Sequence, residues 1–218
     1  ASTYQQISTA YRGQGDGSAA REASTKALDI LRQVVKAHPT LDAPQQSLAD
    51  SLLGTALLLG EEGNQPAAIQ HYNEAISVLD AASTHLPDNL DLALNAARAR
   101  IRLANLLRGE GDSTSADRLF QEVSSILAPR EAKDPTNTKI LLELNSAYSK
   151  RGDLLLDQGK LDDALTEHRK TIEIPERLVK IDPKNVRFQT LRASGYRSVG
   201  LILQRQGKLD DALQNYKT

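Results

Sequence analysis

Apolar and polar residues recur along this chain with the period of an α-helix. Between Gly63 and Pro87 the apolar positions are Ala68, Tyr72, Ala75, Ile76, Leu79 and Ala82. Between Pro87 and Gly111 they are Leu92, Ala96, Ala99, Leu103, Leu106 and Leu107. Steps of three and four residues place each set on one face of a helix. The pattern therefore predicts two amphipathic helices separated by a break at Pro87, and no segment shows the alternation of a β-strand.

The breaks between helices repeat every 48 residues. The heptapeptide GKLDDAL occurs at 159–165 and again at 207–213. The same interval spaces three columns of residues, which are Gly15, Gly63, Gly111, Gly159 and Gly207, then Ala20, Ala68, Ala116, Ala164 and Ala212, and finally Pro39, Pro87, Pro135 and Pro183. Independent columns that keep one period indicate a repeat protein rather than a single globular core.

Each repeat is interpreted as a helical hairpin. Asp16, Asn64 and Asp112 follow three of the glycines and can cap the N–H groups of a helix start. A hairpin cannot bury its apolar stripe alone, whereas stacked hairpins can. We expect one array over 1–218, with units at about 15–62, 63–110, 111–158 and 159–206. Partial helices at 1–14 and 207–218 suggest a fragment of a longer chain.

The amino-acid composition argues against several classes of protein function. The 27 basic and 28 acidic residues nearly cancel, which does not favour a nucleic-acid-binding domain. There is no cysteine, so disulfides and thiolate metal sites are excluded. No apolar run approaches the roughly 20 residues of a membrane span. The sequence thus predicts a soluble chain without membrane insertion. It leaves open the bacterial cytoplasm or the extracytoplasmic side of a membrane protein.

Catalytic, metal and cofactor sites are not predicted. No two of the four histidines have the i, i+4 spacing of a helical metal pair. Asp162-Asp163 and Asp210-Asp211 occupy equivalent repeat positions at helix starts, where negative charge suits the helix dipole. A catalytic carboxylate pair would instead occur once, in a cleft that separates the two pKa values. We therefore expect no enzyme activity from these residues.

The repeat columns resemble the tetratricopeptide repeat (TPR) family. The first unit carries much of the pattern, with Tyr4, Ile7, Ser8, Tyr11, Gly15, Ala20 and Ala27. The family period is 34 residues, whereas it is 48 here, so each helix should be longer by about two turns. The resemblance implies an all-α, right-handed α-solenoid of TPR-like hairpins, with helices of about 20 residues. Phrases such as Asp182-Pro183-Lys184-Asn185 are also similar to arrays attached to bacterial serine/threonine kinases and signalling proteins.

The resemblance further implies a concave face, lined by the first helix of each hairpin, that binds a peptide or a partner helix. By family position, this partner-binding groove would include Arg98, Ile101, Asn105, Arg108, Asp153, Arg197, Leu201 and Gln204. In the N-terminal helices the equivalent positions are Ser2, Gln5, Thr9, Arg12, Asp50, Leu53, Leu57 and Glu61.

Arg98, Asn105 and Arg108 could anchor a carboxylate, because arginine presents a planar fork of donors. Three functions remain open at this stage. The first is a protein-interaction scaffold, for which the partner is a protein or peptide of unknown identity. The second is a regulatory or sensory region of a bacterial signalling enzyme such as a serine/threonine kinase. The third is a scaffold that associates with itself end to end.

Overall fold

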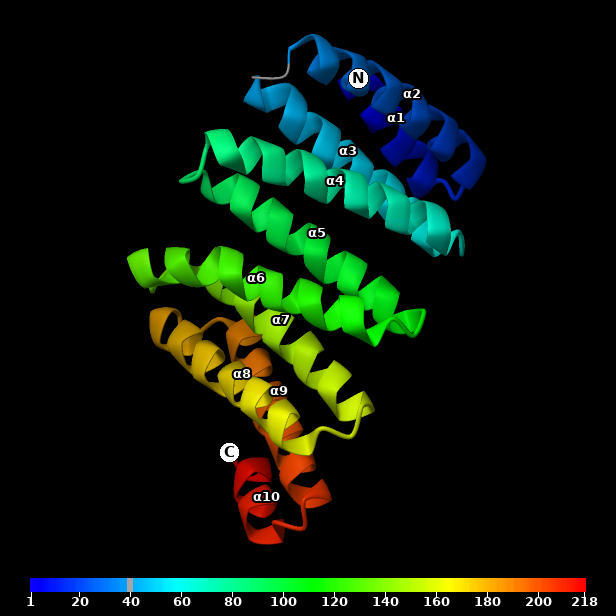
Figure 1. The fold of residues 1–218 in the computed structure, drawn as a ribbon. Helices are drawn as coiled ribbons and strands as arrows, with labels where there is room; N and C mark the ends of the chain where they lie inside the picture. The colour runs from blue at the N-terminus through cyan, green and yellow to red at the C-terminus, as the bar shows by residue number, and fades with distance from the viewer. Residues whose placement is uncertain (39–40) are drawn as a thin grey trace. The chain divides into compact units, whose positions relative to one another are not determined.

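The computed structural model describes residues 1–38 and 41–218, and these residues form helices and turns without a strand. The ten helices of the described residues are α1 (Ser2–Gly13), α2 (Gly17–Ala37), α3 (Asp42–Glu61), α4 (Gln65–His85), α5 (Leu90–Gly109), α6 (Ser113–Lys133), α7 (Thr138–Asp157), α8 (Leu161–Ile181), α9 (Val186–Arg205) and α10 (Leu209–Tyr216) (Figure 1). Helices α2 to α9 are 20 or 21 residues long. The all-α class and the helix length of about 20 residues are confirmed.

Asp and Asn side chains start several helices. Asp16 accepts a hydrogen bond from the Ala19 N–H at 3.0 Å, and Asp112 does the same for Ser115 at 3.0 Å. The backbone N–H of Ser115 is the main cause that lowers the pKa of Asp112. Asn64 caps α4 in the same way. These side chains satisfy N–H groups that the first helical turn cannot pair internally.

The periodic glycines form the tight turns that follow helices α1, α3, α5, α7 and α9. All five have a positive φ, between 73° and 86°, which a side chain with a Cβ rarely adopts. The N–H of the next residue then returns to a carbonyl five positions back, as from Asp112 to Leu107 at 2.8 Å. This is the Schellman arrangement that ends a helix on a left-handed residue. Of the four periodic prolines, Pro39 lies outside the described residues.

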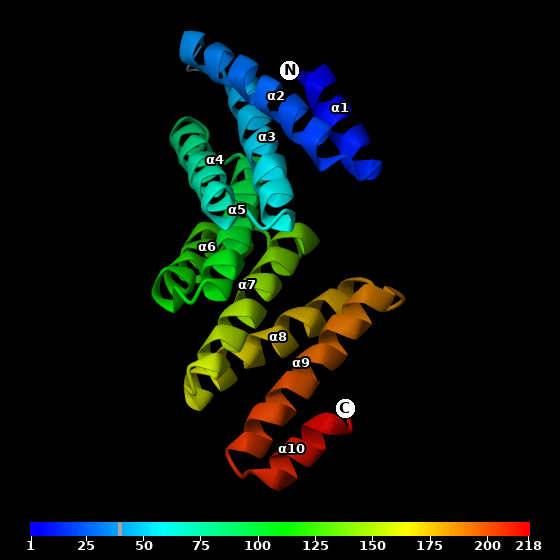
Figure 2. The same cartoon turned by 90° about the vertical axis from the view of Figure 1, so that its right-hand side faces the viewer.

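The chain divides into two compact units, residues 1–106 and 107–218. Within each unit, helices that are neighbours in sequence pack against each other, for example α1 on α2 and α3 on α4 in the first (Figure 1). In the second unit α8 packs on both α7 and α9, and α10 packs on α9 (Figure 2). The expected division into four full repeats stays a prediction.

Leucine and alanine fill both cores. One cluster in the first unit joins Leu28 and Leu31 of α2 to Leu48 and Leu52 of α3 and to Ala75 of α4. A cluster in the second unit joins α7, α8, α9 and α10, and its buried members are Leu155, Ala164, Leu165, Val199, Ile202, Leu203 and Ala212. The five periodic alanines are all 2% exposed or less, so each lies where two helices approach closely.

Candidate functional site

A pocket of about 600 Å³ lies in the first unit, mainly between α1, α3 and α5. Its lining residues are Gln5, Ser8, Thr9, Arg12, Ser24, Ser47, Asp50, Ser51, Leu53, Gly54, Thr55, Leu57, Leu58, Asn95, Arg98 and Arg102. The volume falls in the range of ligand sites in proteins. Nearly all of these residues come from the odd-numbered helices, which are the second helices of the 48-residue units and the first helices of TPR-like hairpins.

Helical spacing places the pocket residues on common faces. On α1 the lining positions advance in steps of three, one and three from Gln5 to Arg12, and on α5 the steps from Asn95 to Arg102 are three and four. Residues so spaced lie above one another on a helix. The Gln5 side chain also donates to the Ser47 carbonyl at 3.3 Å, which joins α1 to α3 across the pocket wall.

The charged groups of the pocket are three arginines and one carboxylate. Arg12, Arg98 and Arg102 are exposed to solvent, and Asp50 is the carboxylate among the lining residues. Although more than a third of the Asp50 surface stays exposed, partial burial of its carboxyl raises the pKa. A ligand that fills the pocket therefore meets an excess of positive charge.

Arg102 lies near a buried tyrosine of α4. Tyr72 is 4% exposed, and burial raises the pKa of its phenol. The charge of the nearby Arg102 guanidinium opposes this shift. The Arg102 side chain itself is exposed to solvent.

The structure places the other predicted groove residues in several environments. Ile101 is 7% exposed, so most of its side chain packs inside the unit, and Asn105 is half-buried. Arg197 and Leu201 are exposed on α9, and Leu201 is 42% exposed. Gln204 accepts a hydrogen bond from the Tyr216 hydroxyl at 3.0 Å.

Arg108 already has a carboxylate partner within the second unit. Its Nε donates to Asp157 at 2.8 Å, and a second guanidinium nitrogen donates to the same oxygen. A ligand carboxylate at Arg108 would therefore have to displace Asp157. The use of Arg98, Asn105 and Arg108 as one anchor stays a prediction.

Asp153 lies beside a buried imidazole. Its carboxylate is 3.5 Å from Nε2 of His168, which is 1% exposed. Partial burial, the largest single effect, raises the pKa of Asp153, but the neighbouring His168, Lys150 and Arg108 together outweigh it, and the pKa is lowered. This pairing joins α7 to α8 and leaves 36% of the Asp153 side chain exposed.

Sequence reasoning did not identify the hydroxyl-rich wall of the pocket or Arg102. Ser47, Ser51 and Thr55 line it from α3. The available signal was the four-residue step from Arg98 to Arg102, which puts both arginines on one helix face.

Metal and membrane chemistry find no structural support in the described part of the chain. Residues 1–38 and 41–218 hold no cluster of three potential metal-ligating side chains. Over the same residues, no helix combines the length and apolar character that a membrane crossing requires.

Comparisons with known proteins identify the repeat. A tetratricopeptide repeat family model matches residues 1–40. The match thus covers the first 40 of the 218 residues. No curated protein sequence matches the chain significantly.

Several solved structures have a similar fold over nearly all of this chain. The TPR-like repeats of a Podosopora anserina kinesin light chain structure align with a TM-score of 0.63 at 15% identity, covering 99% of this chain and 90% of that one. MamA aligns with a TM-score of 0.52 at 20% identity, covering 97% and 91%. The Rap conjugation gene regulator of plasmid pLS20, in complex with the Phr* peptide, aligns with a TM-score of 0.55 at 14% identity, covering 98% and 50%. At these identities the likeness concerns the fold.

Proposed function

We propose that this TPR array is a non-enzymatic protein-interaction scaffold that binds an extended peptide in the pocket of the first unit. The observation that supports the proposal is the pocket itself, which has a volume of about 600 Å³. Its lining residues lie mainly on the helix face that TPR-like hairpins present to partners. Arginine, amide and hydroxyl groups there can pair with a peptide backbone and its side chains.

Two further observations support a peptide as the occupant. Leu53 and Leu57 alternate with polar residues along α3, so the pocket offers apolar contacts beside hydrogen-bonding groups. Such a mixture is typical of sites for small ligands and peptide segments. In addition, a solved structure with a similar fold contains a bound peptide, Phr*.

The second unit has candidate contact residues of its own on α7 and α9. Arg197 and Leu201 are exposed there, one turn apart, and could contact a longer partner. Asp153 and Arg108 would contribute polar contacts only after their present partners rearrange. The alternative that the array regulates a signalling enzyme remains a hypothesis that uses the same surface.

Filling the pocket from its wall tests the proposal. Gly54 lies within α3, and a Cβ there meets no atom within 4 Å, so Gly54→Trp projects a large ring without disturbing the core. Gly109→Trp is the matched control, because Gly109 is also helical, has the same free space and does not line the pocket. Peptides selected on the wild-type protein from a random library should lose about tenfold or more in affinity for Gly54→Trp. Equal binding to the wild type and both variants would refute the pocket as the site.

Self-association is a second candidate, supported by an exposed apolar face on α10. Leu209, Leu213 and Tyr216 are 64%, 50% and 46% exposed, and their spacing puts them on one side of the helix. A second copy could cover this face. Sedimentation velocity of the wild type beside Leu209→Gln/Leu213→Gln tests it: association that the variant abolishes supports it, and a monomer at all concentrations refutes it.

A further inference from the structure

We infer that the pocket of the first unit selects an acidic peptide segment, whose carboxylates bind Arg12 and Arg102 while neighbouring aliphatic side chains contact Leu53 and Leu57. This inference rests on the proposed function and names the class of partner for that pocket. Four steps support it.

The first step is the contrast between the pocket and the unit that contains it. Residues 1–106 carry eight basic and eleven acidic side chains, a net charge of −3. The pocket nevertheless gathers three arginines against the single carboxylate of Asp50. Three of the eight basic side chains of this unit therefore line the pocket, beside one of its eleven acidic side chains.

The second step is the pairing of the remaining cations. On α2, Arg21, Lys26 and Arg32 are each paired with a nearby carboxylate, whereas Lys36 near the end of the helix has no such partner among the described residues. Arg32 binds Glu74 through two hydrogen bonds of 2.7 and 2.8 Å, and Arg21 binds Glu62 at 3.0 Å. Arg12 and Arg102, by contrast, form no ion pair with any described residue of the chain.

The third step is the geometry of these two arginines. Arg12 comes from the last turn of α1 and Arg102 from α5, so the two arginines line the pocket from different helices. Both side chains are exposed to solvent. A guanidinium presents parallel N–H donors that match the two oxygens of a carboxylate.

The fourth step distinguishes a peptide from a nucleic acid. A phosphate backbone needs a continuous run of cations, and its affinity grows with each phosphate neutralised. Here Asp50 interrupts the positive charge, and the surrounding unit is acidic overall. Leu53, Leu57 and Leu58 also give the pocket apolar walls, which suit the aliphatic part of a peptide. The Asn95 side chain adds an amide that can pair with a peptide bond.

Selection from a random 12-residue phage-displayed library, with the whole chain as bait, tests the inference. We expect the peptides enriched on the wild type to contain more Asp and Glu than Lys and Arg. Arg12→Gln/Arg102→Gln should weaken the binding of a synthesised selected peptide by about tenfold or more, because hydrogen bonds to charged groups are lost. Substituting Gln for Glu in that peptide should weaken its binding to the wild type similarly.

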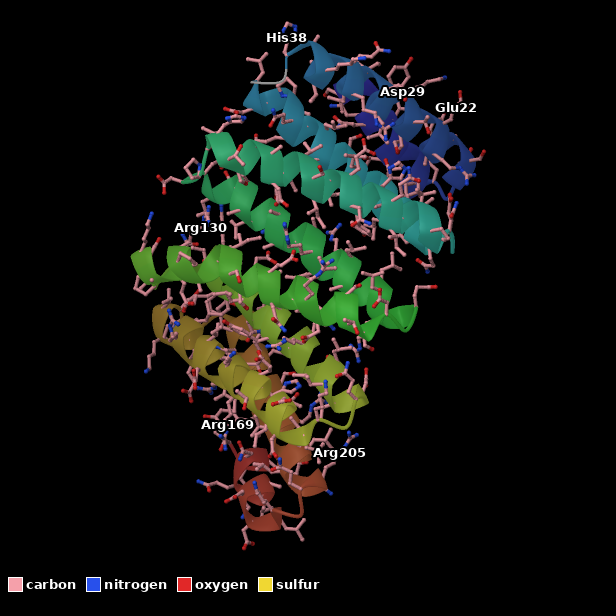
Figure 3. The ribbon with its side chains drawn as sticks, in the orientation of Figure 1. Glu22, Asp29, His38, Arg130, Arg169 and Arg205 are labelled. Atoms are coloured by element: carbon pink, nitrogen blue, oxygen red, sulfur yellow. The ribbon has the colours of Figure 1, made fainter. Side chains whose placement is uncertain are left out.

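A control variant removes the same charge elsewhere. Lys36 is exposed on α2 and Arg169, labelled in Figure 3, is exposed on α8, and neither lines the pocket. Lys36→Gln/Arg169→Gln should bind the selected peptide as the wild type does. Circular dichroism confirms that both variants retain their helices before binding is compared.

Each outcome separates this inference from the proposed function. Enriched peptides that are basic or uncharged, or binding that survives Arg12→Gln/Arg102→Gln, would overturn the acidic class while Gly54→Trp could still block the pocket. An equal loss with both charge variants would show a general electrostatic effect and would also overturn it. If no peptide is enriched at all, the proposed function fails together with the inference.

Discussion

Gly152 lies directly against the buried imidazole of His168, and a Cβ at residue 152 would stand 2.6 Å from Cδ2 and Nε2 of the ring. The relationship recurs one repeat later, where a Cβ at Gly200 would stand 2.6 Å from Cε1 of Tyr216. Between α1 and α2 the equivalent positions hold Ser8 and Ser24, whose hydroxyls are 2.7 Å apart. The size of the residue on one helix is therefore matched to the side chain that the next helix places on it.

This matching predicts an interaction energy between residues 152 and 168. Gly152→Ser alone should destabilise the fold by about 1 to 3 kcal/mol, because the imidazole has no room to retreat. His168→Ser alone should cost about 2 to 5 kcal/mol through the cavity it leaves. The double variant restores the Ser8 and Ser24 pair of residue types and should be more stable than the two losses added together. Urea unfolding of the four proteins measures the coupling, and strict additivity would contradict the prediction.

A second prediction concerns two glycines only two positions apart. Gly111 has a φ of 86° in the turn after α5, whereas Gly109 is the last helical residue and has no atom within 4 Å of an added Cβ. Gly111→Ala should lower the free energy of unfolding by about 1 to 2 kcal/mol, the cost of a left-handed residue with a side chain. Gly109→Ala should be neutral or stabilising by up to about 1 kcal/mol. Thermal unfolding compares them, and similar melting temperatures for both variants would show that the turn tolerates a side chain.

Much of this architecture could be predicted because it depends on residues that are close together in the sequence. Periodic apolar residues define the helices, and Gly111 with Asp112 marks both the end of one helix and the start of the next. The pairing of Arg108 with Asp157 could not be predicted in this way, because the two residues are 49 positions apart and meet only through helix packing. The same holds for Arg102, which lies near Tyr72 of the preceding helix.

The ion pair between Arg32 of α2 and Glu74 of α4 predicts an acid-sensitive contribution to stability. The hydrogen bonds from Arg32 lower the pKa of Glu74 below its ordinary value of 4.5, although burial opposes the shift. The nearby charged groups are Asp29, 3.7 Å from Arg32, and His71, 3.8 Å from Glu74. A lowered carboxyl pKa in the folded state contributes stability above the ordinary pKa, and this contribution is lost as the pH falls through the folded value.

Glu74→Gln should therefore reduce the free energy of unfolding near pH 7 by about 0.5 to 1 kcal/mol, a size typical of solvent-exposed ion pairs. The difference from the wild type should be fully present above pH 4.5 and should shrink as the pH falls through the lowered pKa of Glu74, where the carboxylate becomes protonated. Denaturant unfolding at a series of pH values on both sides of 4.5 measures it. Arg32→Gln/Glu74→Gln serves as the control. Once Arg32 is replaced, the additional replacement of Glu74 should not lower the free energy of unfolding further, because the ion pair is already absent. A Glu74→Gln deficit that is as large at pH 3 as at pH 7 would mean that the carboxylate charge is not the cause.

Gly195 of α9 lies against the backbone of Thr171 of α8 in the second unit. A Cβ at Gly195 would stand 2.2 Å from the Thr171 carbonyl oxygen, so the two backbones are nearly in contact. Pro175 lies four residues after Thr171 and has no N–H to donate to this carbonyl. The Cα–H of Gly195 is thus the group that covers an oxygen without its helical partner.

Gly195→Ala should accordingly destabilise the protein by about 1 to 3 kcal/mol, because backbone rather than a flexible side chain must move. The gain in helix propensity from glycine to alanine, about 1 kcal/mol, offsets only part of this. Gly54→Ala in α3 is the matched control, since its Cβ meets open space and should show the propensity gain alone. Both variants are compared by urea unfolding with unchanged m-values. If Gly195→Ala is as stable as Gly54→Ala, then α8 and α9 can separate without loss, and the close crossing does not contribute to the stability of the unit.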